Sequence, residues 1–128
     1  MTRRYVLLTL LLMGGVLVTD IAWAQSSAQI QELKVGCDKG TAFVCSSLGR
    51  MYYTGQGVKQ DVFQAVDLFR KACDGEDAFG CISLGTMYAE GQGVKQSDTD
   101  ALTYYGKACD LRDEFGCKFY AKLKQKKR

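Results

Sequence analysis

The sequence predicts an all-α repeat fold built from stacked two-helix units. Its six cysteines follow two fixed spacings: Cys37, Cys73 and Cys109 are 36 residues apart, and each is followed eight residues later by another cysteine. Residues 37–72 and 73–108 are identical at 19 of 36 positions. A fixed period of this length is typical of architectures in which no single unit buries its own apolar face.

The first 24 residues have the pattern of an export signal. Arg3 and Arg4 precede an apolar run over residues 6–18, and Ala22-Trp23-Ala24 provides small residues for cleavage. The run has thirteen residues, fewer than the roughly 20 that a membrane-spanning helix needs. We therefore expect a cleaved leader over residues 1–24 and no stable membrane insertion. The rest forms one predicted repeat domain, residues 25–128, with whole units at 37–72 and 73–108 and partial units at 25–36 and 109–128.

Each unit contains two segments in which apolar residues recur at helical spacing. In the first unit, Phe43 and Leu48 belong to one segment, and Val66 and Phe69 belong to the other. We expect the core to include Met51, Tyr52 and their copies, Met87 and Tyr88. The predicted helices and part-helices cover residues 27–36, 41–54, 61–74, 78–90, 98–110 and 113–125.

Glycines and capping residues define the expected helix ends. Gly55-Gln56-Gly57 stops the first helix of the unit where glycine tolerates positive φ, and Asp61 and Ser97 stand where N-caps would begin the second helices. Gly49 and Gly85 lie inside helices, where glycine costs about 1 kcal/mol relative to alanine. We therefore expect them to let neighbouring helices approach closely.

An even number of cysteines in a short exported chain favours disulfides. Two pairings repeat with the units. In the first, Cys37, Cys73 and Cys109 each pair with the cysteine eight residues later; in the second, Cys45 pairs with Cys73 and Cys81 with Cys109. Only the first uses every thiol. It needs a turn between the partners, because eight residues of straight helix span about 12 Å, beyond the roughly 4.4–6.8 Å that a disulfide allows. Without histidine or a Cys-x-x-Cys pair, we expect no metal site, and no cofactor.

The net charge of +3 is unevenly distributed. Residues 25–117 carry nine basic and thirteen acidic residues, whereas the last eleven residues carry six basic ones and no acid: Lys118, Lys122, Lys124, Lys126, Lys127 and Arg128. Such a tail is typical either of a solvated helix end or of attraction to an anionic surface, and both interpretations stay open. We expect no nucleic-acid partner for an exported protein.

The segment Leu48-Gly49-x-Met51-Tyr52-x-x-Gly55-x-Gly57-Val58 and its copy at residues 84–94 resemble Sel1-like repeats. The eight-residue cysteine spacing resembles the Helicobacter cysteine-rich protein type. The resemblance covers essentially all of the chain after the leader. It implies an αα-hairpin solenoid related to tetratricopeptide repeats, with each hairpin junction locked by a disulfide, in a periplasmic or secreted protein.

The same family carries a β-lactamase or penicillin-binding label, so the resemblance implies such an enzyme as the alternative function. Serine β-lactam hydrolysis usually needs Ser-x-x-Lys, and no serine here has lysine three residues on. Ser97-Asp98-Thr99 matches Ser-Asp-Asn only in part, and Lys-Thr-Gly is absent. We therefore predict no catalytic residue, and the sequence favours a non-catalytic binding scaffold.

Exposed positions that differ between repeats are free to specify a ligand. On the first helix these are Ser46, Arg50 and Tyr53, at spacing i, i+4, i+7, which correspond to Ile82, Thr86 and Ala89 in the second repeat. Related helical repeats bind extended peptides along the wall formed by their first helices. We therefore expect this stripe to contact a protein or a peptide, including one derived from the cell wall, although a freely varying surface has the same pattern. The sequence predicts no oligomeric state.

Overall fold

The structure is a computed structural model that describes residues 26–128, and the expected leader lies outside this range. The described part contains six helices and no strand, as predicted. The helices are residues 26–38, α2 (Ala42–Thr54), α3 (Val62–Asp74), α4 (Ala78–Glu90), α5 (Asp98–Asp110) and α6 (Glu114–Lys126). Each begins and ends within two residues of its predicted bounds.

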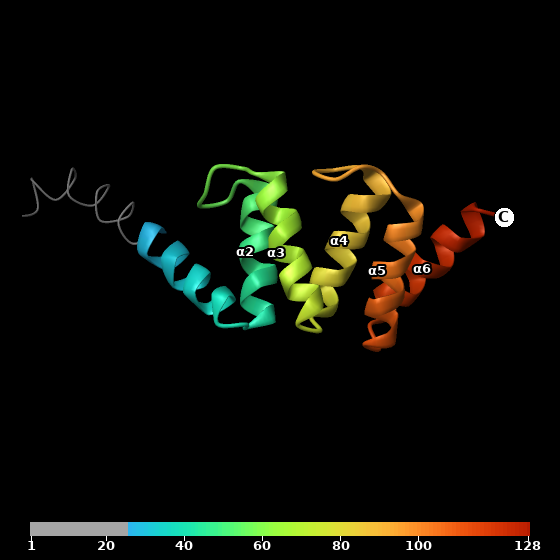
Figure 1. The fold of residues 1–128 in the computed structure, drawn as a ribbon, viewed down its shortest axis with the longest axis horizontal. Helices are drawn as coiled ribbons and strands as arrows, with labels where there is room; N and C mark the ends of the chain where they lie inside the picture. The colour runs from blue at the N-terminus through green and yellow to red at the C-terminus, as the bar shows by residue number, and fades with distance from the viewer. Residues whose placement is uncertain (1–25) are drawn as a thin grey trace, which may run out of the picture.

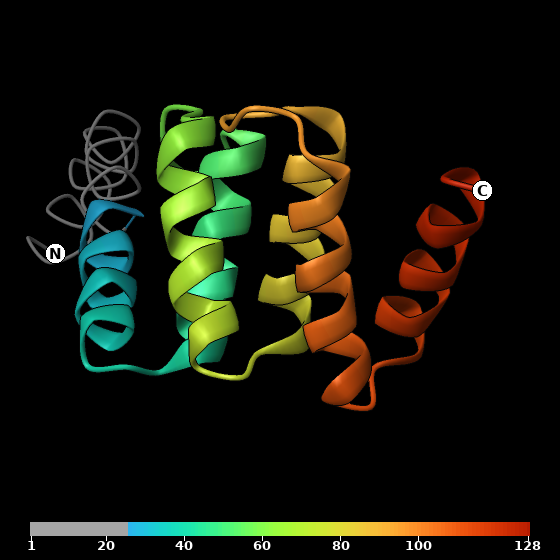
Figure 2. The ribbon, with the colours of Figure 1, turned by 45° about the vertical axis from the view of Figure 1, so that its right-hand side comes forward.

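The helices stand side by side in a row, each antiparallel to the next (Figure 1). α2 pairs with α3 and α4 with α5, and α3 packs against α4 as α5 packs against α6. The first helices of successive units also touch, α2 with α4 and α4 with α6. Figure 2 shows α3 and α5 on one side of the row with α2 and α4 behind them. The chain is thus a short solenoid of αα-hairpins.

Polar side chains begin the second helices where the sequence predicted N-caps. The Asp61 carboxylate accepts from the backbone N–H groups of Phe63 and Gln64 at 3.0 and 3.1 Å, and the Ser97 hydroxyl accepts from that of Asp100 at 3.1 Å. These bonds satisfy donors that the first turn of a helix leaves free. Both predicted caps are confirmed.

Glycines act at two kinds of position. Gly55 and Gly91 end α2 and α4 in the left-handed region, with φ of 73° and 68°. Gly49 and Gly85 lie inside these helices and are buried. A Cβ atom at Gly85 would lie 2.8 Å from the Tyr105 ring, and one at Gly49 would lie 2.9 Å from the Phe69 ring. The predicted close approach of neighbouring helices is therefore confirmed.

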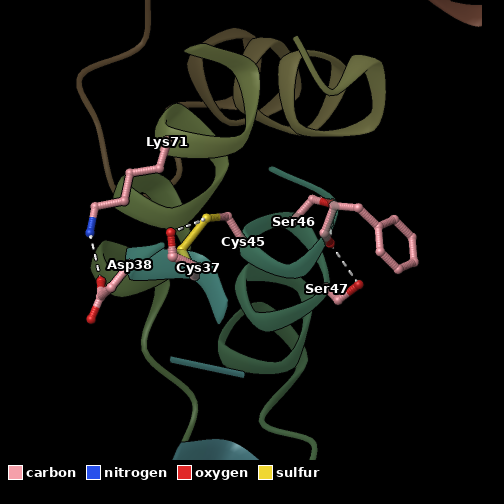
Figure 3. Close-up of a disulfide and its surroundings, with 7 residues drawn as sticks. Cys37, Asp38, Cys45, Ser46, Ser47 and Lys71 are labelled. Carbon is pink, nitrogen blue, oxygen red and sulfur yellow. Dashed lines mark hydrogen bonds and ion pairs between the residues drawn. A yellow bond between two sulfur atoms is a disulfide. The ribbon is translucent and has the colours of Figure 1, made fainter. Parts of the chain in front are cut away.

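Three disulfides join the repeats: Cys37–Cys45, Cys73–Cys81 and Cys109–Cys117, with Cα–Cα distances of 4.6, 4.5 and 4.4 Å. Each connects the last turn of one unit's second helix to the first turn of the next unit's first helix, across a short turn. Figure 3 shows the first of them between the end of the helix at 26–38 and the start of α2. The pairing implied by the family resemblance is confirmed.

The backbones at a junction come so close that little side-chain volume fits between them. A Cβ atom at Gly80 would lie 2.6 Å from the Cβ atom of Ala72. At the first junction the small residue is on the other side: Gly36 stands opposite Val44, and its added Cβ atom would lie 3.2 Å from Cγ1 of that valine. One partner of each pair is glycine because a second full side chain would overpack the junction.

The first prediction concerns the central disulfide. Replacing Cys73 and Cys81 together by serine should lower the free energy of unfolding by about 2–3 kcal/mol, because the bridge restricts the unfolded chain. Urea denaturation of the oxidised variant and of the wild type measures this loss. Full reduction of the wild type breaks all three disulfides, so it should destabilise the protein more than the double substitution does. Equal stability of the oxidised variant and the wild type would contradict the prediction.

The second prediction concerns junction packing. Gly80→Val should destabilise the protein by roughly 1–3 kcal/mol, since it adds a side chain against Ala72. Adding Ala72→Gly recreates the pair found at the first junction and should recover part of the loss, although glycine inside a helix costs about 1 kcal/mol. Denaturation of both single variants and the double variant gives the coupling energy. Losses that simply add would show that the two positions are independent.

Candidate functional site: an apolar groove on the first helices

A groove of about 390 Å³ lies on the face formed by the first helices. Four of the six residues of the predicted stripe line it: Arg50 and Tyr53 from α2, and Ile82 and Thr86 from α4. Ala89, the last position of the stripe, is not among its lining residues. The structure thus gathers most of the predicted stripe around one concave surface.

Ser46, the first residue of the predicted stripe, was expected to be exposed but is buried. Its side chain is 2% exposed, and its hydroxyl donates to the backbone carbonyl of Phe43 at 3.0 Å. Ser46 lines an adjoining hollow of about 270 Å³, which shares Arg50 and Phe79 with the groove. Figure 3 shows Ser46 and Ser47 on the side of α2 away from the disulfide. Because Ser46 bonds its own helix, it shapes the floor of this hollow and is a poor candidate for direct contact.

Exposed phenylalanines form a row that the sequence analysis missed. Phe43, Phe79 and Phe115 occupy equivalent positions in three successive first helices and are 72%, 47% and 63% exposed. Phe43 recurs at helical spacing with the apolar residues of its segment, but unlike Leu48 it lies outside the core. The helical spacing contained the signal for this row. Phe43 lies on the same face of the helix as Ser47, four residues later, and not on the face of Leu48.

Aromatic rings also form much of the groove wall. Phe79 packs its edge against Phe69 of α3, with centroids 6.2 Å apart. Phe119 of α6 lines the same groove and packs on Tyr105 at 5.4 Å. Met87 is 2% exposed and contributes to the floor. The groove therefore offers mainly apolar and aromatic surface, drawn from α2, α3, α4 and α6.

Hydrogen bonds fix the polar groups at the rim. The Tyr53 hydroxyl donates to Oε1 of Gln92 at 2.8 Å and so ties α2 to the loop after α4. The hydroxyl oxygens of Thr86 and Tyr105 lie 3.0 Å apart. Burial raises the pKa of Tyr105, while its hydrogen bond with Thr86 acts in the opposite direction. Tyr105 therefore stays a neutral hydroxyl at physiological pH.

Arg50 is the one charged residue among those that line the groove, and no carboxylate lines it. The three ion pairs of the described residues use Lys71, Lys107 and Lys118. Arg50 is exposed and takes part in none of them. Its guanidinium is therefore available to an anionic group of a ligand.

The hydroxyl groups near the groove have structural roles. Ser47 donates to the carbonyl of Phe43 at 2.9 Å, and Thr86 donates to that of Ile82 at 3.0 Å. Ser97, the residue of the partial β-lactamase motif, caps α5. Each of these three hydroxyl groups is hydrogen-bonded to the backbone of its own helix.

Within residues 26–128, no group of three or more histidine, cysteine or carboxylate residues could hold a metal ion. No helix in this same range has both the length and the apolar character needed to cross a bilayer.

The fold and the groove define a disulfide-linked helical-repeat protein with a concave apolar face. The chain belongs to the Sel1 repeat family, whose sequence profile matches residues 42–77 and 78–113. These matches begin with the first helix of each unit, five residues after the cysteine used above to mark its start. Sel1 repeats are protein-interaction modules. No curated protein sequence is similar enough to count as a match.

Solved structures agree with this assignment. Cysteine rich protein B of Helicobacter pylori is 33% identical with a TM-score of 0.69, over 71% of this chain and 68% of that one. A Sel1 repeat protein from Oxalobacter formigenes is 26% identical with a TM-score of 0.66, over 68% of this chain and 36% of that one. A protective antigen of uropathogenic Escherichia coli is 33% identical with a TM-score of 0.66, over 69% of this chain and 19% of that one.

The chain thus spans about two thirds of the Helicobacter protein, and about a third and a fifth of the other two. Three disulfides and the likeness to the Helicobacter protein indicate an extracytoplasmic protein.

Proposed function

We propose that the protein is an exported, non-catalytic scaffold that binds an extended segment of another protein, or a peptide, in the groove on its first helices. The observation that carries the proposal is the continuous apolar wall formed by Tyr53, Phe79, Ile82 and Phe119, with Arg50 as its single charge. Binding sites typically combine such apolar surface with a few polar groups that fix orientation. No observation favours the β-lactam alternative.

The lining defines the chemistry of the partner. An aromatic or large aliphatic side chain would pack against Phe79 and Ile82, and a carboxylate near it would pair with Arg50. Arginine and aromatic residues are enriched among interface hot spots. A peptide derived from the cell wall would satisfy the same requirements if it carried an apolar group next to an acid.

The proposed location follows from the predicted leader. Residues 1–24 direct export, the chain oxidises outside the cytoplasm, and the protein acts in the periplasm or after secretion. Both compartments allow the disulfides to persist.

The third prediction tests the groove. Peptides selected from a random display library on the purified, oxidised protein should share an aromatic or aliphatic residue next to an acidic one. Phe79→Ala and Arg50→Ala should each weaken the selected peptides by roughly 5- to 100-fold, the range of an interface hot spot. Fluorescence anisotropy measures the affinities.

Phe63→Ala is the matched control. Phe63 lies on α3, is 69% exposed and is not among the residues that line the groove. This variant should bind like the wild type. Equal losses for Phe63→Ala and Phe79→Ala, or unchanged binding by Phe79→Ala, would refute the groove as the contact surface.

A further inference from the structure

A second hollow, separate from the groove, lies between the helix at 26–38, α2 and α3. It has a volume of about 270 Å³ and shares no lining residue with the groove or its adjoining hollow. Lys34, Asp38, Tyr52, Gln64, Leu68 and Lys71 are among the residues that line it. The volume is close to the lower end for ligand pockets, so it suits a single ring more than a large ligand.

The second repeat contains the same constellation 36 residues later. Arg70, Asp74, Tyr88 and Lys107 stand at the positions of Lys34, Asp38, Tyr52 and Lys71. The ion pair between Lys71 and Asp38, at 3.6 Å, is drawn in Figure 3 and returns as the pair between Lys107 and Asp74 at 3.7 Å. The two regions therefore share a tyrosine, an aspartate, two basic residues and one ion pair.

One position differs in a way that changes the space. Tyr104 replaces Leu68, and its ring stacks on that of Tyr88, with centroids 5.5 Å apart and planes 13° from parallel. The Tyr88 hydroxyl accepts from Nη2 of Arg70 at 3.0 Å. In the first repeat Leu68 is 7% exposed and packs with the core, so Tyr52 has no ring stacked on it from this position.

The surroundings of Tyr104 place its ring at the equivalent of this pocket. Burial, together with the nearby Tyr88, Asp74 and Asp100, raises the pKa of Tyr104, while Arg70 acts against them. These four neighbours lie 36 residues after Tyr52, Asp38, Gln64 and Lys34, all of which line the open pocket. The second repeat thus carries a ring of its own, stacked on Tyr88, at the position where the first repeat has Leu68 beside the pocket.

We propose that the pocket at Tyr52 is a binding site for a phenol-type aromatic ring supplied by a ligand. The ring stacks on Tyr52 as Tyr104 stacks on Tyr88, because offset stacking is a preferred geometry of aromatic pairs. Lys34 takes the place of Arg70 and donates to the Tyr52 hydroxyl or to the ligand's own oxygen. A tyrosine side chain in a partner peptide and a free phenol share this chemistry.

The test uses p-cresol and the tripeptide Ala-Tyr-Ala as probes, with Ala-Leu-Ala as the control peptide. Amide shifts in NMR spectra of the isotope-labelled, oxidised protein report binding at residues 34, 52 and 68. We expect both tyrosine-like probes to shift these signals and the leucine peptide not to do so. Tighter binding of Ala-Tyr-Ala than of p-cresol would identify a peptide as the source of the ring, and the reverse would identify a free phenol. The absence of shifts with both probes would overturn the proposal.

Two exchanges between the repeats make the test specific. Leu68→Tyr should fill the pocket with the protein's own ring and weaken probe binding at least about tenfold. Tyr104→Leu should open a second, equivalent site and bring new shifts at residues 70 and 88. Unchanged probe binding by Leu68→Tyr, or no second site in Tyr104→Leu, would overturn the proposal.

Two further variants guard against misfolding and against binding in the groove. Circular dichroism checks that each variant is folded. If Leu68→Tyr or Tyr104→Leu does not fold, Lys34→Ala tests the site instead, because Lys34 is exposed. It should weaken the probes, and unchanged affinity would then count against the site. Phe79→Ala should leave probe binding at Tyr52 intact, so failure of the groove proposal and failure of this one give different results.

Discussion

Each disulfide connects the last turn of a second helix to the first turn of the following first helix, and this short link sets how closely two units meet. With Cα atoms 4.4–4.6 Å apart, there is no space between the backbones for two full side chains. The pairs Ala72 with Gly80 and Gly36 with Val44 are two solutions to this limit. Long solenoids gain order from many stacked neighbours. In this chain, with two matched repeats, covalent links at the junctions supply part of that order.

The disulfides also determine which face of the first helices is exposed. Cys45 is 2% exposed and faces the junction, whereas Phe43, two residues earlier on α2, is directed to solvent. The same two-residue spacing separates Phe79 from Cys81 and Phe115 from Cys117. The disulfides therefore hold the three phenylalanines in register along one face. The covalent core and the proposed binding face are thus two sides of the same helices.

The sequence predicted the helices, their caps and the close approaches at Gly49 and Gly85, because each depends on local spacing. It also identified four lining residues of the groove through positions that vary between repeats. It failed at Ser46 and Phe43 for a physical reason. Phe43 and Phe79 are identical between the repeats, as core residues are, and yet both are exposed. Burial of Ser46 depends on how α2 packs against its neighbours, which the helical period alone does not define.

Differences between the repeats fall at the groove and at the pocket beside Tyr52. Arg50 and its counterpart Thr86 both line the groove, and Leu68 lines the pocket at the position that Tyr104 occupies in the second repeat. A scaffold held by covalent junctions tolerates such changes, since neither position is part of a disulfide or of the glycine contacts at the junctions. Two identical repeats would present the same surface twice, and the pocket at Tyr52 would have the same form in both. Divergence within a fixed frame is therefore the route by which so small a solenoid acquires distinct binding surfaces.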